Sequence, residues 1–182
     1  MTLSQYQSNR IRLNKLAQSS LLIALALSTS YILISIPNVK LIDSLVFLAS
    51  TCLGTSWGVL VASLIWLIYG TINPLGLNPF MLFAVLTGEL VFVGAGKMAN
   101  RFSNFNPIML GLLGGASTLA YDLYTNVLVG ILIYGSIWAG IMTMNFPYPM
   151  GLIHQVSNVI MFATVVPLLR KIMLRRGTGK VG

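Results

Sequence analysis

Two groups of polar residues interrupt stretches of sequence that are otherwise apolar. The first group is Asp122, Thr125 and Asn126, and the second is His154, Ser157 and Asn158. Each group has the spacing i, i+3, i+4, which places its three side chains on one face of an α-helix. Carboxylate, imidazole and amide groups in an apolar helix bind polar molecules, relay protons or join helices. Because an unpartnered polar group in hydrocarbon costs several kcal/mol, we expect the two groups to face each other across a cavity.

The helices that carry these groups have the composition of a membrane protein. Of 182 residues, 56% are hydrophobic and only 8% are charged, and the mean hydropathy is +0.85. Such a chain has room for about six spans of ~20 residues, and none for a soluble catalytic domain. We therefore expect an all-α integral membrane protein with six transmembrane helices. Its single membrane domain would comprise a basic N-terminus (1–15), a six-helix core (16–173) and a basic tail (174–182).

The apolar runs predict spans at 16–36, 41–53, 57–71, 80–99, 108–133 and 151–173. A signal peptide is the alternative for the first run, but its apolar core would normally be only ~7 to 15 residues long. We expect an uncleaved first span. Residues 134–150 are apolar but irregular and suggest an outer lid or interfacial segment. Pro167 is expected to bend the last span.

The basic residues predict the orientation. Ten of the eleven lysines and arginines fall on one side of the six-span layout, and only Lys40 falls on the other. This is the positive-inside pattern, which places both termini in the cytoplasm of a multi-pass plasma-membrane protein. Topology and anionic lipid headgroups account for the net charge of +8, so we expect no nucleic-acid partner.

The depth of each polar group follows from a rise of about 1.5 Å per residue. Counted from the span boundaries, Asp122 should be level with Asn158, and Asn126 with His154. The cavity then lies in the outer half of the molecule. The candidate substrate-binding residues are the two polar groups together with Glu89, Trp138, Tyr148 and Lys40.

Several of these residues have alternative interpretations. The hydroxyl groups of Thr125 and Ser157 can bond the helix backbone, and Glu89 is either a floor for the cavity or an interhelical bond. Lys40 and Asp43 are expected to be solvated or paired with each other, or else to touch the ligand. The single cysteine excludes a thiolate metal cluster, and no bound metal or cofactor is expected, although the lone histidine could ligate a metal centre within a ligand.

Small residues supply a second signal. Ser20, Ala24 and Ser28 recur every fourth residue in the first span, and Gly111 and Gly115 do so in the fifth. Such stripes let another helix approach closely. Gly111 and Gly115 are expected to pack within the chain, whereas the first stripe either packs internally or docks a separate membrane subunit.

In its size, its basic ends, the run "IPNVKLIDSLVFLASTCLGTSWGVLVASLIWLIYG" and the two polar groups, the chain resembles the substrate-binding S components of energy-coupling factor (ECF) transporters. The resemblance implies a high-affinity subunit for a vitamin or heterocyclic precursor, with cobalamin-like and riboflavin-like ligands as candidates. It also implies docking through the first helix onto a transmembrane coupling subunit, with a pair of ATPases supplying energy, so that the chain itself is not an enzyme. A stand-alone proton- or ion-coupled carrier is the alternative. A small membrane enzyme is disfavoured because no catalytic motif is present.

Overall fold

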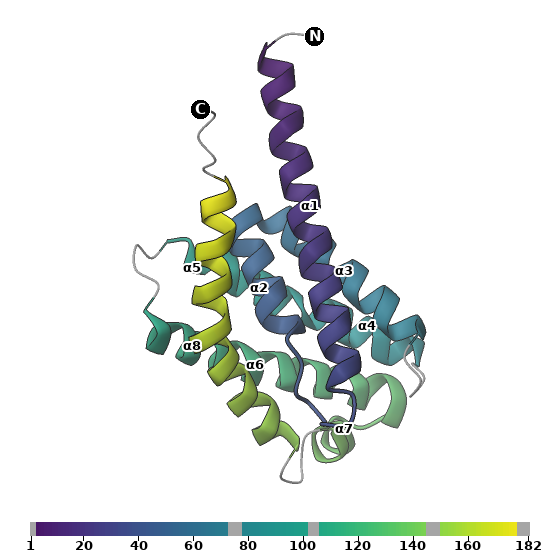
Figure 1. Ribbon diagram of the computed structural model, residues 1–182. Helices are drawn as coiled ribbons and strands as arrows, with labels where there is room; N and C mark the ends of the chain where they lie inside the picture. The colour runs from purple at the N-terminus through teal and green to yellow at the C-terminus, as the bar shows by residue number, and fades with distance from the viewer. Residues whose placement is uncertain (1–2, 73–77, 102–105, 145–149, 178–182) are drawn as a thin grey trace.

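The computed structural model describes residues 3–72, 78–101, 106–144 and 150–177, and within them the regular structure is entirely helical (Figure 1). The elements are α1 (Leu3–Ile32), α2 (Ile42–Leu53), α3 (Thr55–Ile72), α4 (Pro79–Gly88), α5 (Leu90–Ala99), α6 (Pro107–Val129), the π-helical turn η1 (Gly130–Tyr134), α7 (Ile137–Met144) and α8 (Met150–Gly177).

Four stretches in the described part of the chain are long and apolar enough to cross a membrane: Thr55–Ile72, Pro79–Ala99, Pro107–Tyr134 and Gly151–Leu174. The prediction of a helical membrane protein is confirmed to that extent. Six full-length spans are not found, because α1 and α2 do not qualify. The last 18 residues of α1 still include Lys15, Gln18 and several serines. The 12 residues of α2 reach only about 18 Å, against a hydrocarbon core of ~30 Å.

Two of the spans begin at a recognisable capping signal. Asn78 and Asn106 each precede a proline, and their side chains accept hydrogen bonds from the backbone N–H of Phe80 at 2.8 Å and of Ile108 at 2.9 Å. An asparagine N-cap followed by proline in the first turn satisfies one free amide and presets the helical φ angle. This local chemistry explains why the predicted starts at 80 and 108 agree with the structure within one residue.

The short helix α2 lies at the centre of the molecule. Every residue from Ile42 to Ser50 is buried, and α1, α3, α5 and α8 all pack against it. Gly54 joins α2 to α3 with a φ of 111°, a conformation that glycine adopts readily and other residues rarely do. A Cβ on Gly58 would lie 2.8 Å from the Cβ of Ser50, so the two helices form a tight hairpin. An apolar helix of this length, covered on all sides, is a core helix rather than a lipid-facing span.

Helices α6 and α8 form the largest interface and run antiparallel. Glycines bring them together: a Cβ on Gly114 would lie 2.5 Å from Cγ of Phe162, and one on Gly111 would lie 3.1 Å from the carbonyl oxygen of Val159. Gly111 therefore packs within the chain, as expected. Helix α8 continues without interruption through Pro167.

Helix α1 is longer than the predicted span and projects beyond the rest of the bundle (Figure 1). The start of α1 and the finish of α8 lie at one end of the molecule, called here the basic end, and α7 lies at the opposite end. The buried face of α1 carries Ser19, Leu22, Ala26 and Ser30. The predicted stripe of Ser20, Ala24 and Ser28 is exposed instead.

Candidate functional site

All three acidic residues of the chain and its only histidine meet in one buried group near the end that carries α7. We call this group the acid–histidine cluster; it consists of Asp43, Glu89, Thr118, Asp122, His154 and Asn158. The side chains come from α2, from the junction of α4 and α5, from α6 and from α8. No member is more than 9% exposed. Four segments far apart in the sequence therefore converge on one polar centre inside an apolar bundle.

His154 is bonded to an acid on each side. Its Nδ1 lies 2.8 Å from Oδ1 of Asp122, and its Nε2 lies 2.9 Å from Oδ2 of Asp43. A neutral imidazole has only one N–H to donate. Both contacts are therefore hydrogen bonds only when the imidazole is protonated, or when one of the two acids carries the proton. The triad can thus hold and pass a proton among three groups within a water-poor interior.

Asn158 extends the same network toward the middle of the bundle. Its Nδ2 donates to Oδ2 of Asp43 at 2.6 Å and to Oγ1 of Thr118 at 2.8 Å. Thr118 in turn donates to the carbonyl of Gly114 at 2.8 Å. Two neighbouring helices, α6 and α8, are fixed on α2 through these bonds.

The pairing of α6 with α8 corrects the predicted heights. Asp122 is level with His154, and Asn158 is level with Thr118. Counting from the span boundaries alone would make Asp122 level with Asn158, one helical turn away. The difference arises because the close contact of Gly114 with Phe162 sets the register, whereas the prediction assumed that both helices begin at the membrane boundary.

Glu89 joins the cluster from the junction of α4 and α5. It is fully buried, and its Oε1 accepts a hydrogen bond of 2.8 Å from Nε1 of Trp66. Its carboxyl group also interacts electrostatically with that of Asp43, although no hydrogen bond of standard geometry joins them. Glu89 is thus both an interhelical bond, linking α3 to the α4–α5 junction, and an inner member of the cluster.

Lys40 lies in the loop between α1 and α2, next to the aromatic rings of Trp66 and Tyr69. Its Nζ is 4.7 Å from the centre of the Tyr69 ring and 5.3 Å from that of Trp66, within cation–π range. Burial lowers the pKa of Lys40, while the charges of Asp43 and Glu89 act in the opposite direction. The lysine is therefore held beside the cluster and not directed into solvent.

Two acceptor atoms of the cluster have no hydrogen-bond partner among the described residues. They are Oδ2 of Asp122 and Oδ1 of Asn158. Buried acceptors are rarely left without a donor, because the cost of desolvation is then not recovered. The arrangement is therefore short of donors, and a molecule bearing N–H or O–H groups would complete it.

The other predicted site residues lie around or away from this centre. Thr125 bonds the carbonyls of its own helix, and Ser157 does so chiefly, with a longer 3.4 Å contact to the carbonyl of Asn38. Asn126 is buried near the end of α6. Trp138 on α7 is 75% exposed, and Tyr148 falls outside the described residues.

Asp43 belongs to the cluster, which its position in the sequence did not predict. Near an outer turn, we expected Asp43 to be solvated, paired with Lys40 or in contact with the ligand. It is instead only 3% exposed and bonds both His154 and Asn158. The available signal was its position in the first turn of an apolar helix, in a chain with only three acids. A carboxylate there needs partners, and the chain's only histidine was the obvious one.

Within the described residues, no group of three or more histidine, cysteine, aspartate or glutamate side chains has the geometry to hold a metal ion. Comparisons with protein families, with curated proteins and with solved structures find no match to this chain. Its function must therefore be inferred from the cluster and the helices that carry it.

Proposed function

We propose that this chain is the substrate-binding membrane subunit of an ECF-type importer, and that it binds a small organic molecule at the acid–histidine cluster. The observation that carries the proposal is the concentration of all three acids and the single histidine in one buried centre. Ionisable groups inside a membrane bundle are costly and usually functional. The sequence resemblance to S components adds the transport context.

The chemistry of the cluster supports a nitrogen-containing ligand. The unpartnered oxygens of Asp122 and Asn158 accept hydrogen bonds, so they suit N–H groups on a ring or an amide. Tyr121 stands edge-on to His154, with ring centres 5.8 Å apart, and Trp66 and Tyr69 are buried beside Lys40. Aromatic walls around a few convergent polar groups are typical of sites for heterocyclic molecules. A vitamin or vitamin precursor fits this description.

Access to the cluster involves the loop between α1 and α2. Lys40 contacts the aromatic rings from this loop, and the carbonyl of Asn38 accepts the long bond from Ser157. Asn38 has a φ of 58°, in the left-handed region that asparagine tolerates better than most residues. Because the cluster is buried, we infer that this loop moves aside when a ligand enters.

The exposed stripe of α1 supports docking of a second membrane subunit. Ser20, Ala24 and Ser28 lie on the free face of the helix, so internal packing does not account for them. Replacing Ala24 with tryptophan should abolish uptake in cells and leave ligand binding by the isolated chain intact. Equal losses of binding and uptake would contradict the docking role.

A proton-coupled carrier is the second candidate, and the Asp43–His154–Asp122 triad is the observation that favours it. Carboxylate and imidazole groups in series form proton relays in pumps and transporters. Such a carrier would act alone and would need neither ATPases nor a coupling subunit.

Two measurements on purified chain separate the candidates. Extraction and mass spectrometry should identify an organic molecule that co-purifies with the parent chain at about one molecule per chain and is lost from Asp122→Asn. Vesicles containing only this chain should bind that molecule without accumulating it under an imposed pH gradient. Accumulation driven by the gradient would establish the carrier instead, and purification free of any small molecule from both proteins would count against a binding subunit.

A further inference from the structure

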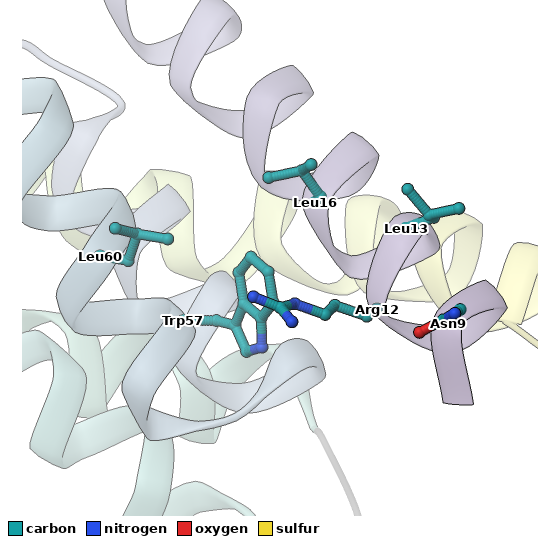
Figure 2. Close-up of a pocket in the computed structure, with 6 residues that line it drawn as sticks. All are labelled: Asn9, Arg12, Leu13, Leu16, Trp57 and Leu60. Carbon is teal, nitrogen blue, oxygen red and sulfur yellow. The ribbon is translucent and has the colours of Figure 1, made fainter. Parts of the chain in front are cut away.

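A second pocket lies toward the basic end, and none of its lining residues belongs to the acid–histidine cluster. This pocket of about 460 Å³ lies between residues 9–16 of α1 and the start of α3. Its lining residues are Asn9, Arg12, Leu13, Leu16, Trp57 and Leu60. Figure 2 shows the Arg12 side chain extending from α1 toward the indole of Trp57 on α3. The volume is in the range of small-molecule sites.

The wall supplied by α1 has a polarity gradient. Asn9, Arg12, Leu13 and Leu16 have the spacing i, i+3, i+4, i+7, which is a single helix face. The polar pair comes first along the helix and the leucines follow, about 6 Å nearer the bundle. Leu13 and Leu16 are more than half exposed. The pocket is thus cationic at its outer mouth and apolar toward the bundle.

The pocket also lies at the level where a membrane would begin. The candidate span Thr55–Ile72 starts two residues before Trp57. Tryptophan is enriched at the interface between hydrocarbon and water, where its ring is apolar on one side and its N–H reaches polar groups. Leu60, one turn further along the span, extends the apolar side of the pocket.

Arg12 has no counter-charge among the residues that the structure describes. It makes no hydrogen bond or ion pair with any other described residue, and all three acidic side chains belong to the cluster near the opposite end. Among the described residues, no anion faces this guanidinium, so it is free to bind one from the surroundings. Guanidinium groups bind phosphate oxygens in pairs, with charge-assisted hydrogen bonds.

We propose that this pocket binds one anionic phospholipid, with its phosphate on Arg12 and Asn9, its glycerol region beside Trp57 and the upper part of an acyl chain on Leu13, Leu16 and Leu60. A cationic mouth, an aromatic residue at interface level and an apolar inner wall together match a membrane lipid. A soluble phosphate would use only the first of these features. The proposal does not depend on which ligand the acid–histidine cluster takes.

The test is lipid retention by the full chain. Detergent-purified protein is offered an equimolar mixture of phosphatidylglycerol and phosphatidylcholine, and the bound lipids are counted by native mass spectrometry. Arg12→Gln should lower the affinity for the tightest phosphatidylglycerol about tenfold or more, as expected for a lost charge-assisted bond. Arg10→Gln is the matched control, because it removes the same charge two residues away and Arg10 does not line the pocket.

The possible outcomes separate cleanly. Loss of phosphatidylglycerol in Arg12→Gln, with little change in Arg10→Gln, would establish the site. Equal losses of about fivefold in both variants would show diffuse attraction of basic residues to anionic lipid and would overturn the proposal. Displacement of the lipid by millimolar glycerol phosphate would also overturn it, because the pocket would then bind a free phosphate. Retention of the lipid by Arg12→Gln would do the same.

Discussion

Replacing His154 with alanine should destabilise the protein through the acids that it leaves behind. In the structure, His154 is the shared partner of Asp43 and Asp122, with contacts of 2.9 and 2.8 Å. Both acids are buried. Without the imidazole, no donor lies between the two carboxylates to offset their mutual repulsion. Asn158 still donates to Asp43 but not to Asp122.

The size of the loss distinguishes a charged network from ordinary helix contacts. Removing one partner of a buried ion pair costs about 3 to 5 kcal/mol, since the other charge remains buried. Two neutral hydrogen bonds between membrane helices contribute only about 1.2 kcal/mol together, at ~0.6 each. We therefore expect His154→Ala to lower the free energy of unfolding by about 3 kcal/mol or more.

The assay is reversible unfolding in mixed micelles, with helical content followed by circular dichroism. Combining His154→Ala with Asp43→Asn and Asp122→Asn removes the stranded charges, so this triple variant should be more stable than His154→Ala alone. Thr125→Val is the control, because that hydroxyl bonds only its own helix. A loss of ~1 kcal/mol for His154→Ala, or a triple variant that is less stable still, would refute the charged-network reasoning.

Two further predictions concern packing and topology. Gly88→Ala should cost about 1 to 3 kcal/mol of stability, because its Cβ would lie 2.7 Å from a side-chain carbon of Thr125. A Cβ at Gly94 would meet no atom within 4 Å, so Gly94→Ala should be neutral or stabilising in the same unfolding measurement. Equal effects of the two substitutions would contradict the packing. In a chain with Cys52 replaced by serine, a cysteine at position 10 should react with impermeant reagents from the cytoplasmic side and one at position 137 from the opposite side; labelling of both from one side would refute the orientation.

The parts of the fold that local chemistry determines were predictable from sequence. The starts of α4 and α6 follow from the Asn-Pro pairs at 78–79 and 106–107, and the spacing of each polar group placed Asp122 and His154 on helix faces that do meet. The extent of α1 was not predicted, because its polar and basic first turns have no apolar periodicity although they are helical from Leu3.

The parts that depend on packing were not predictable in the same way. The height of Asp122 relative to α8 depends on how Gly114 contacts Phe162, which no count along a single helix gives. The burial of Asp43 depends on α2 lying inside the bundle, covered by four other helices. A 12-residue apolar run is compatible with a short span and with a core helix, and only the surrounding helices decide between them.

The most direct test of the central claim is the affinity of the purified chain for its co-purified molecule, measured by titration calorimetry on the parent and on Asp122→Asn. Oδ2 of Asp122 is one of the buried acceptors without a donor. If a ligand N–H donates to it, Asp122→Asn should weaken ligand binding by about 1 to 3 kcal/mol. Ser157→Ala is the control, since its hydroxyl donates chiefly to the backbone of its own helix. A selective loss in Asp122→Asn, in protein that remains folded, is the predicted result. Binding as tight as that of the parent would show that the cluster only joins helices and that the ligand site lies elsewhere.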